Sequence, residues 1–375
     1  MSGLESTSQI LRPDLPMPAA RADPTLPRHL AFAYGLLILY ACLHPLAGWK
    51  PTGLPPLDFL FAPWPKYFRY ADLALNLLGF VPFGFVLAPA LPERLGRAGA
   101  VVVATLIAGV LSFSMEVTQN FLPTRVSSNI DLGFNVLGGL IGALAGVRWG
   151  HALFDERGWL HRWRSERIIP GHSGDLGLML LGLWLLAQLM PDSLLFGSGD
   201  LRQLLGLPTP LHFDPERFIL LESVVVAVSL VAVGLFFRCM MQAASPLPVA
   251  LLLLLGLAAK TVATASFFAP DAALVWLTPG TTRGLLYGVP LLAAALMLPR
   301  LHQHALAGVT MLAATTLTNL LPDNPYFMLG LASLQQGNFL NFHGLTRLTA
   351  NLWPFLALSY LSAIGLWRGE HLAGR

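Results

Sequence analysis

The chain contains little charge. Only 11% of its 375 residues are Asp, Glu, Lys or Arg, whereas 55% are hydrophobic and the mean hydropathy is +0.62. A water-soluble domain carries about 25% charged residues, so this composition excludes a soluble globule. A chain in lipid must satisfy its own backbone hydrogen bonds, which helices do. The sequence therefore predicts an all-α, polytopic transmembrane helical bundle.

Basic clusters and cysteines are also scarce. The 23 Lys and Arg residues and 20 Asp and Glu residues leave a net charge of only +3. A nucleic-acid surface needs clustered basic residues with aromatics between them, so we expect no nucleic-acid partner. The two cysteines, Cys42 and Cys239, lie in apolar runs on opposite sides of the predicted bilayer. No disulfide is expected.

The chain lacks the familiar catalytic and cofactor motifs in the sequence context, such as a strand followed by a helix, in which they function. We find no HExxH, CxxC, Walker loop, GxGxxG fingerprint or G-x-S-x-G elbow in such a context. His302 and His304 lie two residues apart, so they face different sides of a helix and do not predict a metal pair. The sequence therefore predicts no cofactor and no metal site.

Apolar runs are what the chain has in abundance. A membrane-spanning helix takes about 20 predominantly apolar residues. We predict about ten spans, and these runs begin near Leu30, Ala71, Ala98, Ile130, Asp175, Phe218, Leu247, Gly284, Ala305 and Ala350. Residues 1–28 are rich in proline and contain no apolar core, so they predict a disordered tail and not a cleaved signal.

Arginine predicts the orientation and the domain boundaries. The densest cluster lies between the fourth and fifth spans and marks that loop as cytoplasmic, so both termini are expected in the cytoplasm. The cluster is Arg148, Arg157, Arg162, Arg164 and Arg167. Trp149, Trp159 and Trp163 accompany it and favour an interfacial helix. The predicted parts are a tail (1–28), a four-helix module (29–150), a linker (151–171), a multi-helix domain (172–368) and a short tail (369–375).

A repeated motif marks the four-helix module. Asp-Leu-x-x-Asn-x-x-Gly occurs at Asp72–Gly79 and again at Asp131–Gly138. On a helix the Asp and Asn share a face, while the Gly offers a bare patch for another backbone. Two alternatives stay open: each Asp caps its helix, and each Asn acts as an interhelical hydrogen bond without a ligand role.

The helix between the two copies carries Glu116 and Gln119 on one face, and Arg125 follows in a short loop. An ionised carboxylate at the bilayer centre costs about 2.5–3.5 kcal/mol, so Glu116 needs protonation, water or a partner. Arg125 can pair with Glu116 or Asp131, grip a phosphate or carboxylate, or simply anchor the interface. We therefore predict one outward-facing polar pocket built from Asp72, Asn76, Glu116, Gln119, Arg125, Asp131 and Asn135.

The second half offers two weaker signals. Glu222 and Lys260 stand inside predicted spans and suggest a buried ion pair, either as a packing lock or as part of a substrate path. The segment 321–349 mixes polar and apolar residues, which predicts a stretch lying on or dipping into the outer face.

Several motifs resemble the VanZ-like membrane protein family over about residues 30–150. They are Asn76–Phe80 leading into Pro82-Phe83-Gly84, Ser114-x-Glu116-x-x-Gln119, Pro123-x-Arg125 and Asp131-x-x-x-Asn135-x-x-Gly138. The resemblance implies a four-helix integral membrane module, in the inner (cytoplasmic) membrane of a bacterial cell. It also implies a link to the glycopeptide teicoplanin, because the founding member of the family is associated with lowered susceptibility to it. The resemblance supplies no molecular activity.

Three functional hypotheses follow. The first is a non-enzymatic protein that engages a cell-envelope or lipid-linked component at the outer face, with glycopeptide tolerance as the implied trait; its partners would be membrane lipid and a lipid-linked precursor or glycopeptide. The second is a secondary transporter or flippase of a lipid-linked or small polar substrate. The third is an intramembrane enzyme in which Glu116 and Asp131 act as acid and base on a lipid-linked substrate. The oligomeric state is left open.

Overall fold

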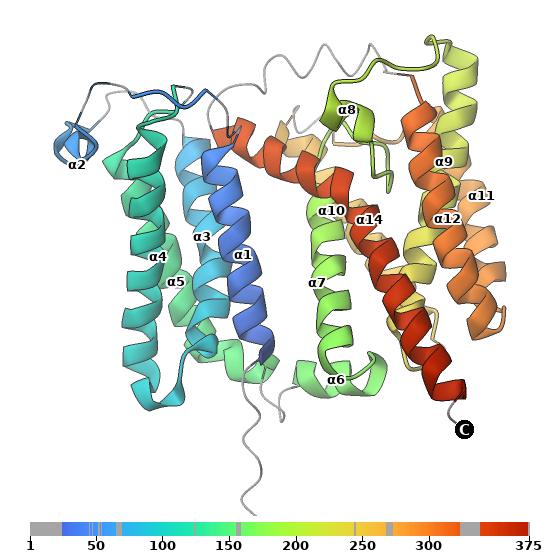
Figure 1. Ribbon diagram of the computed structural model, residues 1–375, viewed down its shortest axis with the longest axis horizontal. Coiled ribbons are helices and arrows are strands. Elements are labelled where there is room, and N and C mark those ends of the chain that lie inside the picture. The colour runs from blue at the N-terminus through green and yellow to red at the C-terminus, as the bar shows by residue number, and fades with distance from the viewer. Residues whose placement is uncertain are drawn as a thin grey trace, which may run out of the picture.

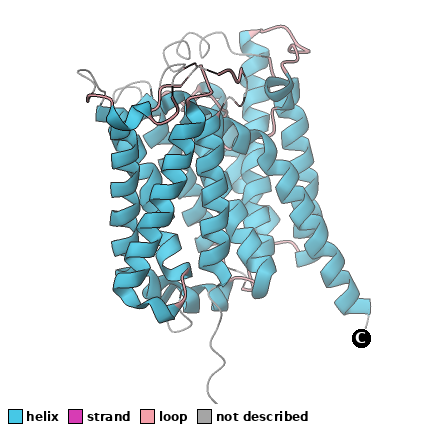
Figure 2. Cartoon of the chain, turned by 60° about the vertical axis from the view of Figure 1, so that its left-hand side comes forward, coloured by secondary structure: helices cyan, strands magenta, loops and turns pink. Residues whose placement is uncertain are grey.

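Helices make up the regular structure of the computed structural model (Figures 1 and 2). The structure describes residues 25–373 apart from 45, 47, 52, 54, 65–69, 124, 155–158, 244, 268–272 and 323–337. These residues form 13 α-helices and one short 3-10 helix, with an isolated β-bridge between Ile168 and Met241. The all-α prediction is confirmed. Most of the predicted tail, and the polar part of segment 321–349 from 323 to 337, lie outside the described residues.

The first half is a group of four long helices that pack side by side. Its elements are α1 (Thr25–Leu43), α2 (Asp58–Phe61), α3 (Tyr70–Ala90), η1 (Glu93–Leu95), α4 (Gly96–Gln119) and α5 (Asn129–Phe154). The closest approach is between α3 and α5, where glycines bring two backbones into contact. A Cβ on Gly138 would lie 2.2 Å from the Leu77 carbonyl oxygen, and one on Gly142 would lie 2.0 Å from that of Val81. The close approach of α3 and α5 therefore depends on having glycine at these positions.

The glycines of the repeated motif differ from each other. Gly138, in the second copy, lies against the backbone of α3 as predicted. Gly79, in the first copy, has no described atom within 4 Å of the position of a Cβ. The prediction that both copies form a packing groove is therefore right for the second copy and wrong for the first.

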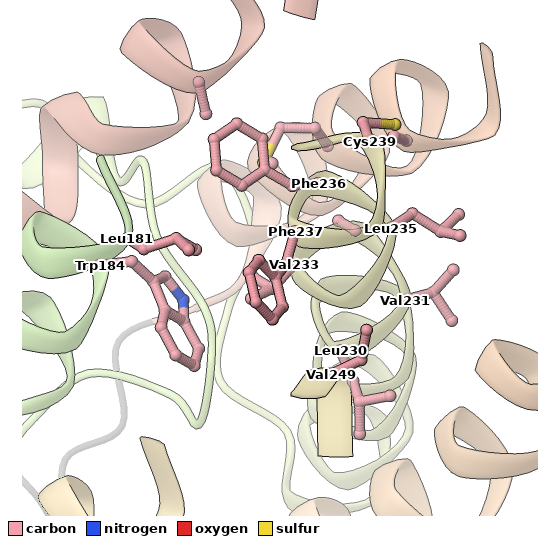
Figure 3. Close-up of a cluster of buried hydrophobic side chains, with 14 of the residues drawn as sticks. Leu181, Trp184, Leu230, Val231, Val233, Leu235, Phe236, Phe237, Cys239 and Val249 are labelled. Atoms are coloured by element: carbon pink, nitrogen blue, oxygen red, sulfur yellow. The ribbon is translucent and has the colours of Figure 1, made fainter. Parts of the chain in front are cut away.

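The second half surrounds one central helix. Its elements are α6 (Trp159–Arg167), α7 (Gly171–Gln188), α8 (Leu201–Leu205), α9 (Pro215–Met240), α10 (Leu247–Phe267), α11 (Pro279–Leu296), α12 (Arg300–Leu320) and α14 (Asn338–Ala373). Helix α9 packs against α7, α10, α11, α12 and α14. Its side chains interdigitate with Leu181 and Trp184 of α7 (Figure 3). Trp184 and Phe236 are fully buried, so large aromatic residues build this core.

Seven helices of the described chain are long and apolar enough to cross a membrane: α1, α3, α4, α5, α9, α10 and α14. The protein is therefore a polytopic helical membrane protein. Helices α7, α11 and α12, of 18 to 21 residues, complete the set of ten long helices that the apolar runs predicted, but they fall short in apolarity. In α12 the reason is the polar start at Arg300, His302, Gln303 and His304. The last helix begins at Asn338, well before the predicted start near Ala350.

The bundle has two ends, which we call the upper and lower faces as in Figure 1. Helix α4 ends and α5 begins at the upper face, whereas α1 begins and α14 ends at the lower face. The start of α1 and the end of α14 thus share a face, as the predicted topology requires; the compartment that each face meets stays a prediction. Helix α6 lies across the lower face, where Arg167 stacks over the ring of Trp163 at 5.5 Å.

Helix α14 joins the two halves. Its Gly344 lies so close to α1 that a Cβ would approach the ring of His44 to 2.4 Å. Further along, the Trp353 indole donates to the Leu180 carbonyl of α7 at 2.7 Å. The upper ends of the first and second halves are therefore in contact through this one helix.

Candidate functional site

Glu116 ties the last turn of α4 to the start of α5. Its side chain is only 4% exposed, and Oε2 accepts the backbone N–H of Ser128 at 2.9 Å. The Ser127 hydroxyl donates to the Glu116 carbonyl oxygen at 2.6 Å. Asp131, in the first turn of α5, interacts electrostatically with Glu116. The two carboxylates thus come together at the upper face.

Helix α5 begins with a serine cap. The Ser128 hydroxyl oxygen accepts the N–H of Asp131 at 3.4 Å, three residues on, which is the usual capping pattern. The side chain that caps α5 here is therefore that of Ser128 and not, as the alternative above had it, that of Asp131. Asp131 occupies the first turn, where the helix dipole favours a negative charge.

Arg125 binds the end of α1. Its Nε donates to the His44 carbonyl oxygen at 3.2 Å, and Nη2 donates to the same atom. Among the described residues, Arg125 therefore binds this backbone carbonyl and does not form the expected ion pair with Glu116 or Asp131. Burial lowers the pKa of the guanidinium, and burial together with the positive charge of Arg125 lowers the pKa of His44.

Cys42 lies beside this group, in the last turn of α1, within electrostatic range of Glu116, Arg125 and Asp131. We call these four residues the upper-face cluster. Cys42 was not among the predicted pocket residues, because an isolated cysteine in an apolar run carries no functional signal.

Gln119 and Asn135 serve the packing of the domain. Gln119 is 8% exposed and donates from Nε2 to the Cys42 carbonyl oxygen at 2.9 Å. Asn135 is 5% exposed and donates from Nδ2 to the Ser112 hydroxyl at 2.9 Å. The Asn135–Ser112 contact lies one helical turn below the contact between Glu116 and the start of α5. Both amides therefore act as interhelical hydrogen bonds, the alternative left open for the asparagine.

The first copy of the motif, with Asp72 and Asn76, lies in the first turns of α3 and is not part of the upper-face cluster. Asn76 is half-buried on α3, and the backbone of Asp72 lies in the first turn of the same helix. The Asp72 side chain lies outside the described part of the structure. Of the seven predicted pocket residues, Glu116, Arg125 and Asp131 therefore gather in one cluster, Gln119 contacts its edge, and Asn135 lies one turn deeper.

The predicted ion pair between Glu222 and Lys260 is wrong. Both side chains are buried, but Glu222 accepts hydrogen bonds from the hydroxyls of Thr278 at 2.6 Å and Thr281 at 3.2 Å. Lys260 donates to the carbonyl oxygens of Met190 and Ser193, each at 2.6 Å. Sequence reasoning missed these partners because hydroxyls and backbone carbonyls satisfy buried charges without leaving a charge pattern.

One group on the lower face has the geometry of a metal site. Ligand atoms of His29, His172 and Asp175 all lie within 4.8 Å of one another. The Asp175 carboxylate also pairs with Arg164 of α6, and burial lowers the pKa of that guanidinium. The sequence analysis predicted no metal and did not weigh this group; His172 and Asp175, three apart on one helix face, are the signal available.

Fold and site together define a polytopic membrane protein whose first four long helices carry a polar cluster at one end. Residues 34–149 match the model of the VanZ/LLP1 family, so the chain contains a VanZ/LLP1 family domain over these residues. The predicted resemblance is confirmed, and the upper-face cluster lies within the domain. Comparison with curated proteins and with solved structures gave no match.

Proposed function

We propose that this protein is a non-enzymatic envelope protein whose VanZ/LLP1 domain engages a lipid-linked component at the upper face. The observation that carries the proposal is the gathering of two carboxylates and one guanidinium at a single end of the domain. Arginine bias in the sequence favours this end as the outer one. A component carried on lipid would meet it at the level of the headgroups.

Exposure divides the cluster into two roles. Glu116 is nearly buried and already accepts the Ser128 N–H, so it positions the loop between α4 and α5. Asp131 and Arg125 are half-exposed, so a ligand can reach them. The described contacts of Arg125 use Nε and Nη2, which leaves Nη1 for a phosphate oxygen, while Asp131 suits a hydroxyl or ammonium donor.

The same burial favours binding over catalysis. A general acid or base must lie within hydrogen-bond reach of a proton on its substrate. Glu116, the deeper carboxylate, is only 4% exposed and its contacts are with the protein backbone. We therefore place the function in holding a headgroup, with lowered susceptibility to teicoplanin as the trait to examine.

The proposal is tested with Arg125→Gln and Asp131→Asn, each in the full-length chain. We expect both variants to insert at normal levels but to lose at least about tenfold in affinity for a polyprenyl diphospho-sugar in detergent micelles, because its phosphate oxygens would face Arg125 and its sugar hydroxyls Asp131; tenfold corresponds to one charge-assisted hydrogen bond. Teicoplanin susceptibility of a host expressing the chain should rise in parallel. The matched control is Arg97→Gln, which removes an exposed arginine at the opposite end of the same domain.

The control variant should behave as the parent chain in both assays. Parental affinity and parental susceptibility in Arg125→Gln and Asp131→Asn, at equal amounts in the membrane, would overturn the proposal. Because Arg125 also holds the His44 carbonyl, Asp131→Asn is the cleaner variant if Arg125→Gln lowers the yield.

A further inference from the structure

A cavity with several polar residues in its lining lies outside the VanZ/LLP1 domain. It has a volume of about 120 Å³ and opens among the upper ends of α7, α9, α11, α12 and α14 and the loop that leads to α8. The polar residues that line it and matter here are Asp192, Asp200, Arg202, Glu222, Thr281 and Asn351. Sequence reasoning had singled out only Glu222 among them.

Arg202 is the cation among the lining residues, and only some of its N–H groups form hydrogen bonds with the described protein. The residue is 9% exposed, and Nη2 donates to Asp200 at 3.2 Å and to the Thr318 carbonyl oxygen at 3.5 Å. Its Nε and Nη1 are buried and have no hydrogen-bond partner among the described residues. A buried donor without a partner costs about 1–3 kcal/mol, and more when it is charged, so these two groups call for an acceptor.

A second lining residue, Asn351, also has a donor without a described hydrogen-bond partner. Asn351 is 3% exposed, and its Nδ2 is buried without a hydrogen-bond partner in the described part of the chain. Two independent side chains, one charged and one neutral, thus line the same cavity and each carry N–H groups without a partner among the described residues. An anionic oxygen on a ligand would satisfy both kinds of donor.

The rest of the lining has the opposite character. Asp192, Asp200 and Glu222 provide three carboxylates against the single guanidinium of Arg202. The two threonine hydroxyls that donate to Glu222 fix its Oε1, and Lys260 points at backbone carbonyls and is not among the lining residues. Asp200 pairs with Arg202, and Asp192 lies 4.0 Å from Nδ1 of His343, but Oδ1 of Asp192 is buried and accepts no hydrogen bond from the described residues. Asp192 and Glu222 therefore offer acceptors to a cationic group.

We propose that this cavity binds a small zwitterionic group, with its oxyanion at Arg202 and its ammonium on the side of Glu222 and Asp192. A cavity of 150 Å³ accommodates benzene, so about 120 Å³ admits a group of roughly five or six heavy atoms. Glycine, an α-amino acid, has five heavy atoms and fits this volume; O-phosphoethanolamine, an aminoalkyl phosphate, has eight, so part of its phosphate would lie in the mouth of the cavity. The site is independent of the function proposed for the VanZ/LLP1 domain.

Binding to the purified full-length protein in detergent tests the proposal. The probes are glycine and O-phosphoethanolamine, compared with the single-charge compounds ethylamine, acetate and inorganic phosphate. We expect at least one zwitterion to bind about tenfold or more tightly than every single-charge compound. Arg202→Gln and Glu222→Gln should each weaken that binding about tenfold. The matched controls are Arg217→Gln and Glu216→Gln, which change exposed residues of α9 outside the lining and should leave binding unchanged.

Asn351→Leu provides a variant that does not depend on the stability of Arg202. Removing an amide whose Nδ2 has no partner should leave the melting temperature unchanged or higher, while weakening the zwitterion. Equal binding of zwitterions and single-charge compounds, or parental affinity in both Arg202→Gln and Asn351→Leu, would overturn the proposal.

The source of the zwitterion is resolved in lipid nanodiscs. If it is the headgroup of a phospholipid, the parent protein retains phosphatidylethanolamine over phosphatidylcholine in native mass spectrometry, and Arg202→Gln loses this preference. If it is a free molecule, the parent shows no lipid preference and glycine or O-phosphoethanolamine binds in nanodiscs with the affinity measured in detergent. Absence of both results would contradict the site.

Discussion

The VanZ/LLP1 domain and the second half of the chain differ in the buried polar groups that they leave without a partner. In the domain, Glu116, Gln119 and Asn135 each form a hydrogen bond with a neighbouring segment, although Oδ1 of Asn135 accepts none from the described residues. In the second half, Arg202 and Asn351 keep buried N–H groups that no described residue engages. The group left over at Asn135 is a neutral acceptor, whereas Arg202 is a cation, so the second half holds a charged donor that a ligand can satisfy.

The two regions also pack differently. Glycines let the backbones of α3 and α5 touch in the domain, which requires small side chains but few large ones. In the second half, α9 packs against several helices, and Trp184 and Phe236 lie between them (Figure 3). Trp353 of α14 is buried in the same core. A larger residue in place of a glycine would therefore disrupt the α3–α5 interface, whereas a smaller residue in place of an aromatic one would disrupt the core around α9.

Gly142→Ala should break this comparison most severely. The new Cβ would lie 2.0 Å from the Val81 carbonyl oxygen, a backbone atom that cannot turn aside. We expect a loss at or above the upper end of the range of about 1–3 kcal/mol for overpacking, seen as a lower melting temperature in detergent.

The control for that variant is Gly79→Ala in α3, where no described atom lies within 4 Å of the new Cβ. Alanine is the better helix former, so stability should stay level or rise by up to about 1 kcal/mol. Similar melting temperatures for the two variants would show that close contact between backbones does not hold α3 to α5.

Asn135→Leu and Asn351→Leu sharpen the comparison of polar groups. Asn135→Leu removes the partner of a buried Ser112 hydroxyl, and hydrogen bonds between membrane helices contribute about 0.6 kcal/mol on average, up to about 1.7. Asn351→Leu removes an amide whose Nδ2 has no described partner, so its free energy of unfolding should be unchanged or larger. Thermal unfolding of both variants decides the matter, and a loss in Asn351→Leu as large as that in Asn135→Leu would remove the contrast.

Much of the fold was predictable because lipid imposes a strong constraint on sequence. The ten predicted runs correspond to ten long helices, of which seven are apolar enough to cross a membrane, since a helix in hydrocarbon needs a continuous apolar stretch. The start of α14 was placed too late because its first turns carry polar residues, and hydropathy cannot distinguish a polar helix end from a loop.

The candidate site was only partly predictable. Glu116 and Asp131 lie where α4 ends and α5 begins, and spacing along the two helices is enough to indicate their depth and face. The partner of Arg125 was not predicted, because a backbone carbonyl such as that of His44 exists at every residue and leaves no mark in sequence. Arg202 was overlooked for a similar reason: its unused N–H groups are a property of the packing around it.

His44 allows the smallest effect to be tested, at the place where the two halves meet. Burial, followed by the charges of Arg125, Arg347 and His343, lowers the pKa of His44 below its usual 6.5. The folded protein therefore binds this proton less readily than the unfolded chain does. The stability that comes from neutral His44 is fully present above about pH 6.5 and is lost as the pH falls below that value.

We expect the melting temperature of the parent protein to fall between pH 7.5 and pH 5.5, and His44→Gln to show a smaller fall. The comparison of the two isolates His44 from other titrating groups, and His212→Gln, which changes an exposed histidine, serves as the control and should fall as the parent does. Because Gly344 of α14 lies directly against the His44 ring, a proton at this ring acts on the contact between the VanZ/LLP1 domain and the second half. An equal fall in His44→Gln and the parent would mean that this contact is indifferent to the charge of His44, so that the two halves are joined by packing alone.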